Sequence, residues 1–176
     1  DTADGKAECL FEGCCATFIG DGSRIAFLSG GRLIVRAADG KERCIANGVE
    51  DFLFSPDAKR VVLVRMVATK SSIEPKEDDL PKATGMVIND LMYKHWDHYV
   101  RDIPHPFVAD FGEGGIADER DILEGEPYEC PMEPFGGVEQ LCWSGDGNTV
   151  AYACRKKTGR DYAISTDSDI FLYDVN

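Results

Sequence analysis

The sequence predicts an all-β fold: a partial β-propeller of about three four-stranded antiparallel blades, with loop insertions. Two observations carry this prediction. A strand–turn–strand pattern recurs three times along the 176 residues, and shorter strand-like segments follow each copy. Repeated four-stranded units are typical of propellers, because one unit cannot bury both faces of its sheet without neighbours.

The repeated pattern is anchored on an aspartate in a turn. An aromatic residue stands three positions before the aspartate, and a β-branched residue stands four positions after it. A second apolar or aromatic residue stands five positions before the aspartate, and another stands six positions after it. Spacings of two on each side of a turn indicate strand faces rather than helix faces. The three copies are Ala16, Phe18, Asp21, Ile25 and Phe27; Phe52, Phe54, Asp57, Val61 and Leu63; and Leu141, Trp143, Asp146, Val150 and Tyr152.

The residues of each turn suit a tight reversal. The aspartate side chain can accept hydrogen bonds from backbone N–H groups just beyond it, and Pro56 fixes φ in the middle copy. Gly22 and Gly147 permit positive φ, but Ala58 takes the equivalent place in the middle copy. We therefore expect either a different turn type or some backbone strain at Ala58.

More strands follow each hairpin. The first is followed by "GRLIVRAADG" and "KERCIANG", the second by "DLMYKHWDHYV" and "HPFVADF", and the third by "SDIFLYDVN". Each unit is therefore expected to hold up to four short antiparallel strands.

The turns are unevenly spaced. Asp57 lies 36 residues after Asp21, but Asp146 lies 89 residues after Asp57, about twice a blade of roughly 40–45 residues. Two polar stretches, 71–86 and 112–136, are interpreted as insertions between strands, although residues 58–136 could instead hold a second unit.

The expected domain organisation follows from these turns. Residues 1–176 form one partial propeller with approximate blades 9–48, 49–136 and 137–176, about two and three-quarter blades in all. Propellers typically close with four or more blades. The chain is therefore expected to be part of a longer protein.

Composition excludes several partners. The formal net charge is −13, which argues against binding nucleic acid or an anionic membrane surface, because both require a basic surface. No apolar run approaches the roughly 20 residues that span a bilayer. The sequence shows no signal peptide, and we predict no cofactor.

Cysteines offer no metal motif. No pair has CxxC spacing, which makes a zinc or thioredoxin-type site an unfavoured interpretation. Most have apolar neighbours and are expected to be buried thiols, while one or two disulfides stay open as an alternative. The seven are Cys9, Cys14, Cys15, Cys44, Cys130, Cys142 and Cys154.

Nucleophile and nucleotide motifs fail on their context. No GxSxG is present, and Ser29 and Ser144 lack both its first glycine and its strand-to-helix setting. "DFGEGGIA", residues 110–117, contains DFG and GxGxxA, but "DERDILEG" follows instead of an apolar helix. We interpret its glycines as loop glycines.

Two further sets of side chains are candidate sites. "YKHWDHYVRDIPH" holds all three histidines, but on a strand His95 and His98 point to opposite faces, so a metal site is not favoured over packing. Carboxylates near the start of the hairpins could bind the positive end of a substrate, although a solvated edge is favoured. These are Glu12, Glu50 and Glu139. We therefore predict no catalytic, cofactor-binding or metal-binding residue.

The hairpin sequences resemble a known group of propellers. "FSPDAKRVVLV" and "WSGDGNTVAYA" are similar to TolB-type and dipeptidyl-peptidase-type repeats. Residues 79–100, "DLPKATGMVINDLMYKHWDHYV", and the following "HPFVADF" resemble the propeller of dipeptidyl-peptidase V and acylaminoacyl-peptidase-like enzymes, of the prolyl oligopeptidase family. So does the stretch "PMEPFGGVEQLCWSGDGNTVAYACRKKTGRDYAISTDSDIFLYD", residues 131–174.

The resemblance implies an activity for a parent protein rather than for this chain. Family members join an N-terminal propeller to an α/β-hydrolase domain whose Ser, Asp and His cleave short peptides by acyl transfer. The propeller restricts entry and helps hold the substrate's N-terminus, and bacterial relatives are typically periplasmic or otherwise exported. The hydrolase domain has no counterpart in this sequence, and the double-glutamate motif of dipeptidyl-peptidase IV is not recognisable, so no family site residue is carried over.

Three functions are consistent with these observations. The favoured one is the N-terminal propeller fragment of an exported dipeptidyl or acylaminoacyl peptidase, which gates and orients short peptides for a serine hydrolase domain. The partners would then be those peptides, the missing blades and the hydrolase domain. The alternatives are a non-enzymatic TolB- or WD-like propeller module for protein–protein interaction, and a structural β-protein that closes as a homodimer.

Overall fold

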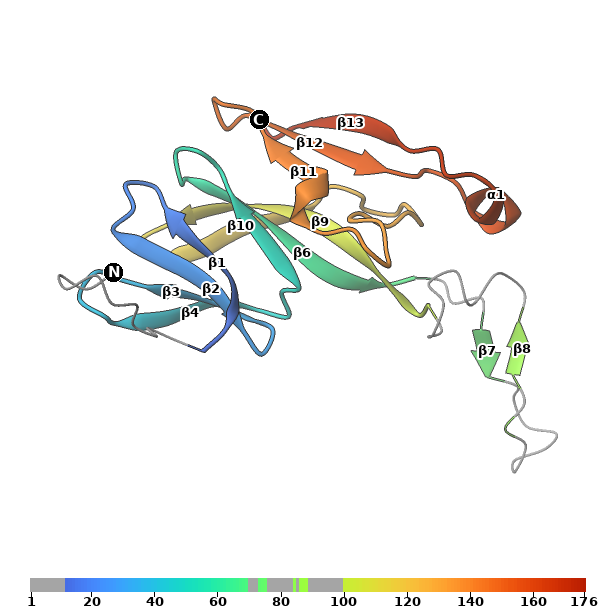
Figure 1. Ribbon diagram of the computed structural model, residues 1–176, viewed down its shortest axis with the longest axis horizontal. Helices are drawn as coiled ribbons and strands as arrows, with labels where there is room; N and C mark the ends of the chain where they lie inside the picture. The colour runs from blue at the N-terminus through green and yellow to red at the C-terminus, as the bar shows by residue number, and fades with distance from the viewer. Residues whose placement is uncertain (1–11, 70–72, 76–83, 85, 89–99) are drawn as a thin grey trace.

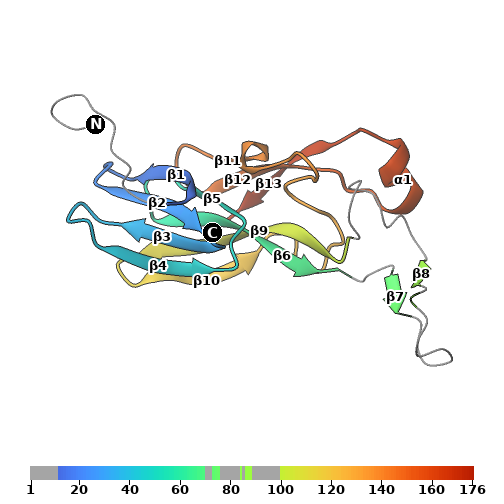
Figure 2. The ribbon, with the colours of Figure 1, turned by 60° about the horizontal axis from the view of Figure 1, so that its bottom comes forward.

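The computed structural model describes residues 12–69, 73–75, 84, 86–88 and 100–176. In these residues three antiparallel sheets of three or four strands follow one another along the chain (Figures 1 and 2). The predicted all-β class is confirmed, since the described helices are the short α1 (Gly159–Ile164) and one 3-10 turn, η1 (Val138–Gln140). The described sheets do not close into a ring.

The first sheet is a meander of neighbouring strands. Its order is β1-β2-β3-β4, and each pair is antiparallel. The two strands predicted after the first hairpin are confirmed as β3 and β4. The bounds are β1 (Cys14–Ile19), β2 (Arg24–Ser29), β3 (Arg32–Arg36) and β4 (Glu42–Asn47).

The second sheet has the order β10-β9-β6-β5, and a two-stranded sheet, β7-β8, interrupts its chain between β6 and β9. Because β6 pairs directly with β9, the first predicted insertion is indeed an excursion from this sheet. The bounds are β5 (Asp51–Phe54), β6 (Arg60–Ala68), β7 (Ile73–Pro75), β8 (Met86–Ile88), β9 (Asp102–Gly112) and β10 (Gly115–Asp121).

Two expectations for this region have different outcomes. The predicted strand at residues 90–100 lies outside the described residues, apart from Val100. The prediction that 112–136 is wholly an insertion is wrong, because Gly115–Asp121 is the fourth strand, β10. β10 is an exposed edge strand that carries charged side chains, and such a strand lacks the apolar alternation by which strands are recognised.

The third sheet has three strands in the order β11-β12-β13. The predicted strand in "SDIFLYDVN" is confirmed as β13, and α1 lies in the connection that precedes it. The bounds are β11 (Leu141–Trp143), β12 (Thr149–Cys154) and β13 (Asp169–Asp174).

The repeated pattern is the first hairpin of each sheet. The aromatic residue before each turn pairs with the β-branched residue after it, as in Phe54 with Val61 and Trp143 with Val150. Phe18 pairs with Ile25 in the same way. The predicted hairpins are therefore confirmed, and the structure shows that they share one register next to the turn.

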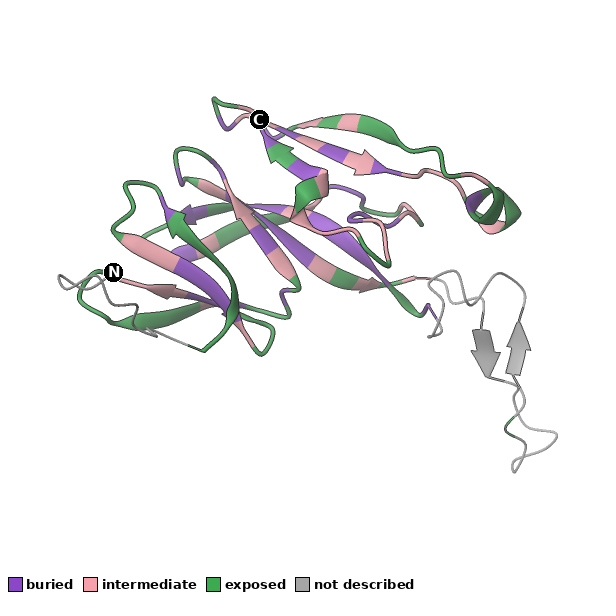
Figure 3. Cartoon of the chain, viewed as in Figure 1, coloured by how far each residue is buried: buried purple, intermediate pink, exposed green. Residues whose placement is uncertain are grey.

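Strand β6 supplies both layers of the hydrophobic core. Val61 and Leu63 belong to a buried cluster with the first sheet, and Val62 and Val64 belong to a second cluster with the third sheet. Side chains alternate along a strand, so the unbroken apolar run of β6 is that of a strand covered on both faces. Buried residues accordingly line the interior of the stack (Figure 3).

In all three aspartate turns the carboxylate accepts the backbone N–H two residues later, and in the second and third it also accepts the hydroxyl of the serine two residues earlier. Asp57 Oδ1 accepts the backbone N–H of Lys59 at 3.1 Å and the hydroxyl of Ser55 at 2.8 Å. These bonds, first that of Ser55, hold the pKa of Asp57 below its ordinary value. Ala58 has φ 54°, in the left-handed region that favours glycine. Of the two alternatives expected there, this positive φ, shared with Gly22 and Gly147, favours backbone strain over a different turn type.

A pair of glycines in the third turn tests this backbone requirement. Gly147 has φ 70°, whereas no positive φ is recorded for Gly145, and a Cβ at Gly145 would have no neighbour within 4 Å. We expect Gly147→Ala to lower the free energy of unfolding by about 1 kcal/mol. Gly145→Ala should leave it unchanged or raise it by up to about 1 kcal/mol.

Urea denaturation of both variants, followed by tryptophan fluorescence, provides the measurement. Equal effects of the two substitutions would contradict the role assigned to positive φ in this turn.

Candidate functional site

The two ends of the stacked sheets differ in their connections. Antiparallel strands place every second connection at the same end. One end, here the turn end, has tight reversals at 20–23, 37–41, 55–59, 113–114 and 144–148. The other, here the loop end, has the connections 30–31, 48–50, 122–140 and 155–168, and the chain between β6 and β9 leaves and returns there. α1 and the β7-β8 pair lie toward this end in Figure 1.

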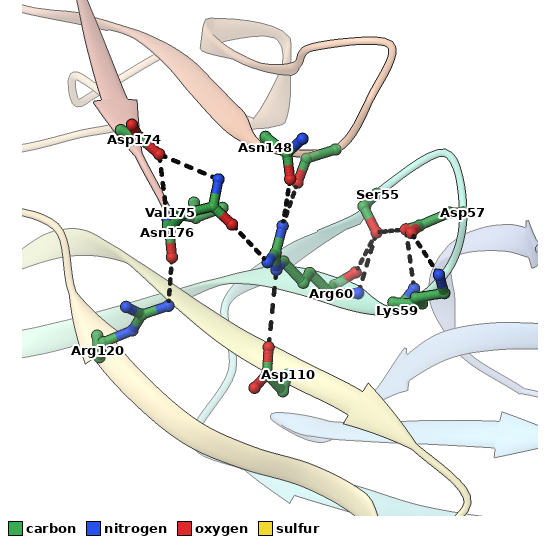
Figure 4. Close-up of polar contacts among 11 residues, drawn as sticks. Ser55, Asp57, Lys59, Arg60, Asp110, Arg120, Asn148, Asp174, Val175 and Asn176 are labelled. Carbon is green, nitrogen blue, oxygen red and sulfur yellow. Dashed lines mark hydrogen bonds and ion pairs between the residues drawn. The ribbon is translucent and has the colours of Figure 1, made fainter.

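At the turn end, Arg60 joins the second and third sheets (Figure 4). Its Nη1 donates to the Gly147 carbonyl at 2.8 Å and to Asn148 Oδ1 at 3.0 Å, and its Nη2 donates to Asn176 Oδ1 at 3.1 Å. Asp110 lies 3.7 Å from Arg60 Nε and supplies an opposite charge. The guanidinium therefore fixes the distance between two neighbouring aspartate turns.

At the loop end, buried polar contacts join segments 122–140 and 155–168. The Tyr162 hydroxyl of α1 donates to the carboxylate of Glu129, and both residues are buried. Burial, and then this hydrogen bond, raise the pKa of Tyr162. Lys156 Nζ lies 2.6 Å from Glu126 Oε2 and 4.6 Å from the centre of the Phe171 ring. These contacts hold α1 against the preceding segment.

Two large apolar side chains remain exposed on those same segments. Phe135, before η1, is 76% exposed, and Ile164, at the end of α1, is 79% exposed. Neither side chain is part of the hydrophobic core. Connections that are held in place and carry exposed side chains are common positions for binding functions.

The candidate carboxylates all lie at the loop end, just before or at the first strand of a sheet. Glu12, Glu50 and Glu139 are exposed, as the solvated-edge interpretation requires. Sequence reasoning missed Asp51, which the fold brings toward Glu139. A Cβ at Gly137 would lie 2.8 Å from Glu139 Oε2 and 3.8 Å from Asp51 Oδ2.

The two serines with a possible nucleophile role lie in a turn or beside one. The Ser144 hydroxyl donates to Asp146 Oδ1 at 2.6 Å and accepts the Thr149 N–H at 2.9 Å, so it closes the third aspartate turn. Ser29 ends β2 beside the 30–31 turn. The "DFGEGGIA" stretch forms the end of β9, a tight turn and the start of β10. This stretch is therefore a β-hairpin and does not open a helix, as a dinucleotide-binding loop would.

Of the three histidines, only His105 is described; His95 and His98 lie outside the described residues. His105 is buried on β9, and its Nδ1 lies 2.8 Å from Asp121 Oδ2 on β10. No group of three or more potential ligands is placed to hold a metal ion within the described ranges. None of the helices described there is long and apolar enough to cross a membrane.

The expectation that most cysteines are buried is wrong for four of the six described ones. Cys130 and Cys154 are buried, and Cys9 lies outside the described residues. The others lie on β1, β4 and β11, at positions that the neighbouring strands leave exposed. These exposed thiols are Cys14, Cys15, Cys44 and Cys142.

Comparison with known proteins supports the sequence resemblance. No family model matches the chain. "Dipeptidyl-peptidase 5" of Porphyromonas gingivalis is 49% identical over 166 residues, which cover 90% of this chain and 24% of that protein. The protein of the same name from Porphyromonas endodontalis is 40% identical over the same shares. The chain thus spans about a quarter of the length of these relatives.

Solved structures show the same kind of fold. An acylaminoacyl peptidase from Pyrococcus horikoshii matches 97% of this chain and 25% of its own, with a TM-score of 0.56 and 17% identity. An acylaminoacyl peptidase in complex with Z-Gly-Gly-Phe-chloromethyl ketone matches 93% of this chain and 24% of its own, with a TM-score of 0.54 and 14% identity. The predicted resemblance to this group is confirmed, and the matches are consistent with a fragment of a prolyl oligopeptidase-family peptidase.

The contacts of Arg60 predict a measurable stabilisation of the interface between the second and third sheets. Arg60→Ala should lower the free energy of unfolding by about 1–3 kcal/mol, because it removes charge-assisted hydrogen bonds to the neighbouring sheet. Lys59→Ala is the matched control, since Lys59 is exposed and pairs with Asp57 of its own turn. Exposed pairs are worth at most about 1 kcal/mol. Urea denaturation provides the measurement, and equal losses of unfolding free energy in the two variants would contradict the role assigned to Arg60.

Proposed function

We propose that this chain is part of the β-propeller of an exported serine exopeptidase, and that it gates and orients short peptides for a hydrolase domain elsewhere in the parent protein. The observation that carries the proposal is the match to two dipeptidyl-peptidase 5 proteins over 90% of this chain and 24% of theirs. The share of their length that lies outside the match leaves room for a catalytic domain.

The three sheets are proposed to be successive blades with approximate limits 9–48, 49–136 and 137–176. The third has three strands, one fewer than the other two, and its last strand, β13, is an edge. Ile170 and Leu172 of β13 are 77% and 73% exposed. Covering each such side chain is worth about 1.5–3 kcal/mol, which supports a further blade of the parent protein as the neighbour of this face.

The gating role is assigned to the loop end. The tight reversals of the turn end leave little chain to contact a peptide, whereas segments 122–140 and 155–168 carry exposed Phe135 and Ile164. The buried Glu129–Tyr162 contact holds these two segments together. Such a surface can limit the size of a peptide that passes it without supplying any catalytic group.

The proposed partners follow from the same account. They are short peptides, the remaining blades and the hydrolase domain, while the net charge of −13 disfavours nucleic acid. A periplasmic or secreted location is part of the proposal, supported by the family resemblance.

The activity of the parent protein tests the proposal. The chain alone should hydrolyse neither dipeptidyl nor acyl-amino-acid reporter substrates, and a fluorophosphonate probe should not label it. A protein expressed from the full open reading frame should do both, because acyl transfer needs a triad and an oxyanion hole. Stoichiometric labelling of one serine in the chain alone, or an unreactive full-length product, would overturn the proposal.

The same assay can test the gating role separately. In the active protein, Phe135→Ala should change the ratio of kcat/KM for longer peptides to kcat/KM for dipeptidyl reporters by about fivefold. This change corresponds to the loss of about 1 kcal/mol of contact between the side chain and the peptide. Phe18→Ala is the matched control, because Phe18 is also an exposed aromatic but lies beside a turn-end reversal. Equal changes of this ratio in both variants would contradict a role of the loop end in selecting peptides.

A further inference from the structure

We propose that Cys130 and Cys154 are a redox pair that can be oxidised to a buried disulfide, which would join the segment after β10 to the end of β12. This inference concerns a covalent modification; it rests on the exported location in the proposed function but not on the proposed peptidase activity. It rests on the way in which the two side chains meet inside the second core cluster, where both residues have no exposed surface.

The two thiols make reciprocal contacts. Cys130 Sγ lies 3.5 Å from the carbonyl oxygen of Ala153, the residue before Cys154. Cys154 Sγ lies 3.4 Å from the carbonyl oxygen of Glu129, the residue before Cys130. Each sulfur therefore touches the peptide group that leads into the other cysteine. Disulfides need nearby Cα atoms and Cβ atoms that face one another, and these mutual contacts place both side chains in one small volume.

The surrounding contacts hold this arrangement in place. The Cys130 N–H donates to the Pro104 carbonyl of β9 at 2.9 Å, so the backbone at Cys130 is fixed on the second sheet. Cys154 pairs with Asp169 in the third sheet. The neighbouring Glu129 receives the Tyr162 hydroxyl of α1. A disulfide here would therefore cross-link segments held by two different sheets.

The chemistry is a two-electron oxidation. The thiols of Cys130 and Cys154 lose two protons and two electrons as the S–S bond forms, and a disulfide of a thiol–disulfide oxidoreductase accepts them and becomes two thiols. Burial raises the pKa of Cys130 to about 12 and that of Cys154 to about 11. Because the thiolate is the reactive form, oxidation should take place while the chain folds in an oxidising compartment, before the core closes.

Peptide mass spectrometry tests the proposal on the chain produced in a bacterial periplasm. Exposed thiols are first blocked with one alkylating reagent in the native state, and the protein is then unfolded without reductant and treated with a second. We expect a peptide pair linked through Cys130 and Cys154 that separates on reduction. Attachment of the second reagent to both cysteines, or a link from either one to another cysteine, would overturn the proposal.

Thermal unfolding gives an independent readout. Reduction should lower the Tm of the wild-type chain by roughly 6–12 °C, since a cross-link over a loop of this size constrains the unfolded chain. The Cys130→Ala and Cys154→Ala double variant should show no shift on reduction. Cys142→Ala, at an exposed thiol, should keep the wild-type shift, and loss of the shift in this control would contradict the assignment.

Discussion

The arrangement of the chain depends on one constraint: a β-sheet with two apolar faces must be covered on both. Strand β6 meets this constraint by sending Val61 and Leu63 into one core and Val62 and Val64 into the other. Its sheet is consequently fixed between the first and third sheets. The outer face of the third sheet has no such cover in the described residues, and there Ile170 and Leu172 remain exposed.

The same repetition gives the two ends of the sheets different kinds of connection. At one end the aspartate turns and the Arg60 contacts hold neighbouring sheets at a fixed spacing. At the other end two of the connections, 122–140 and 155–168, are much longer and keep large apolar side chains at the surface. A repeated hairpin can tolerate this variation at one end because its register is fixed by the turn at the opposite end.

The sequence predicted the hairpins, because an aromatic residue, an aspartate and a β-branched residue recur at fixed spacings. It did not predict β10, whose charged residues lie on an exposed edge, nor the approach of Asp51 to Glu139, which requires two sheets to be adjacent. The exposed cysteines were also missed, because an apolar neighbour in sequence does not show that a strand position is covered by another sheet. The reciprocal contacts of Cys130 and Cys154 join positions 24 residues apart and could be found only in three dimensions.

Hydrogen exchange at β13 tests the central claim that these sheets are consecutive blades of a larger ring. The backbone amides of β13 that do not face β12 should exchange rapidly in the chain alone. They should become protected in a protein expressed from the full open reading frame, where another strand is predicted to pair with this edge. Equally rapid exchange in both proteins would contradict the claim.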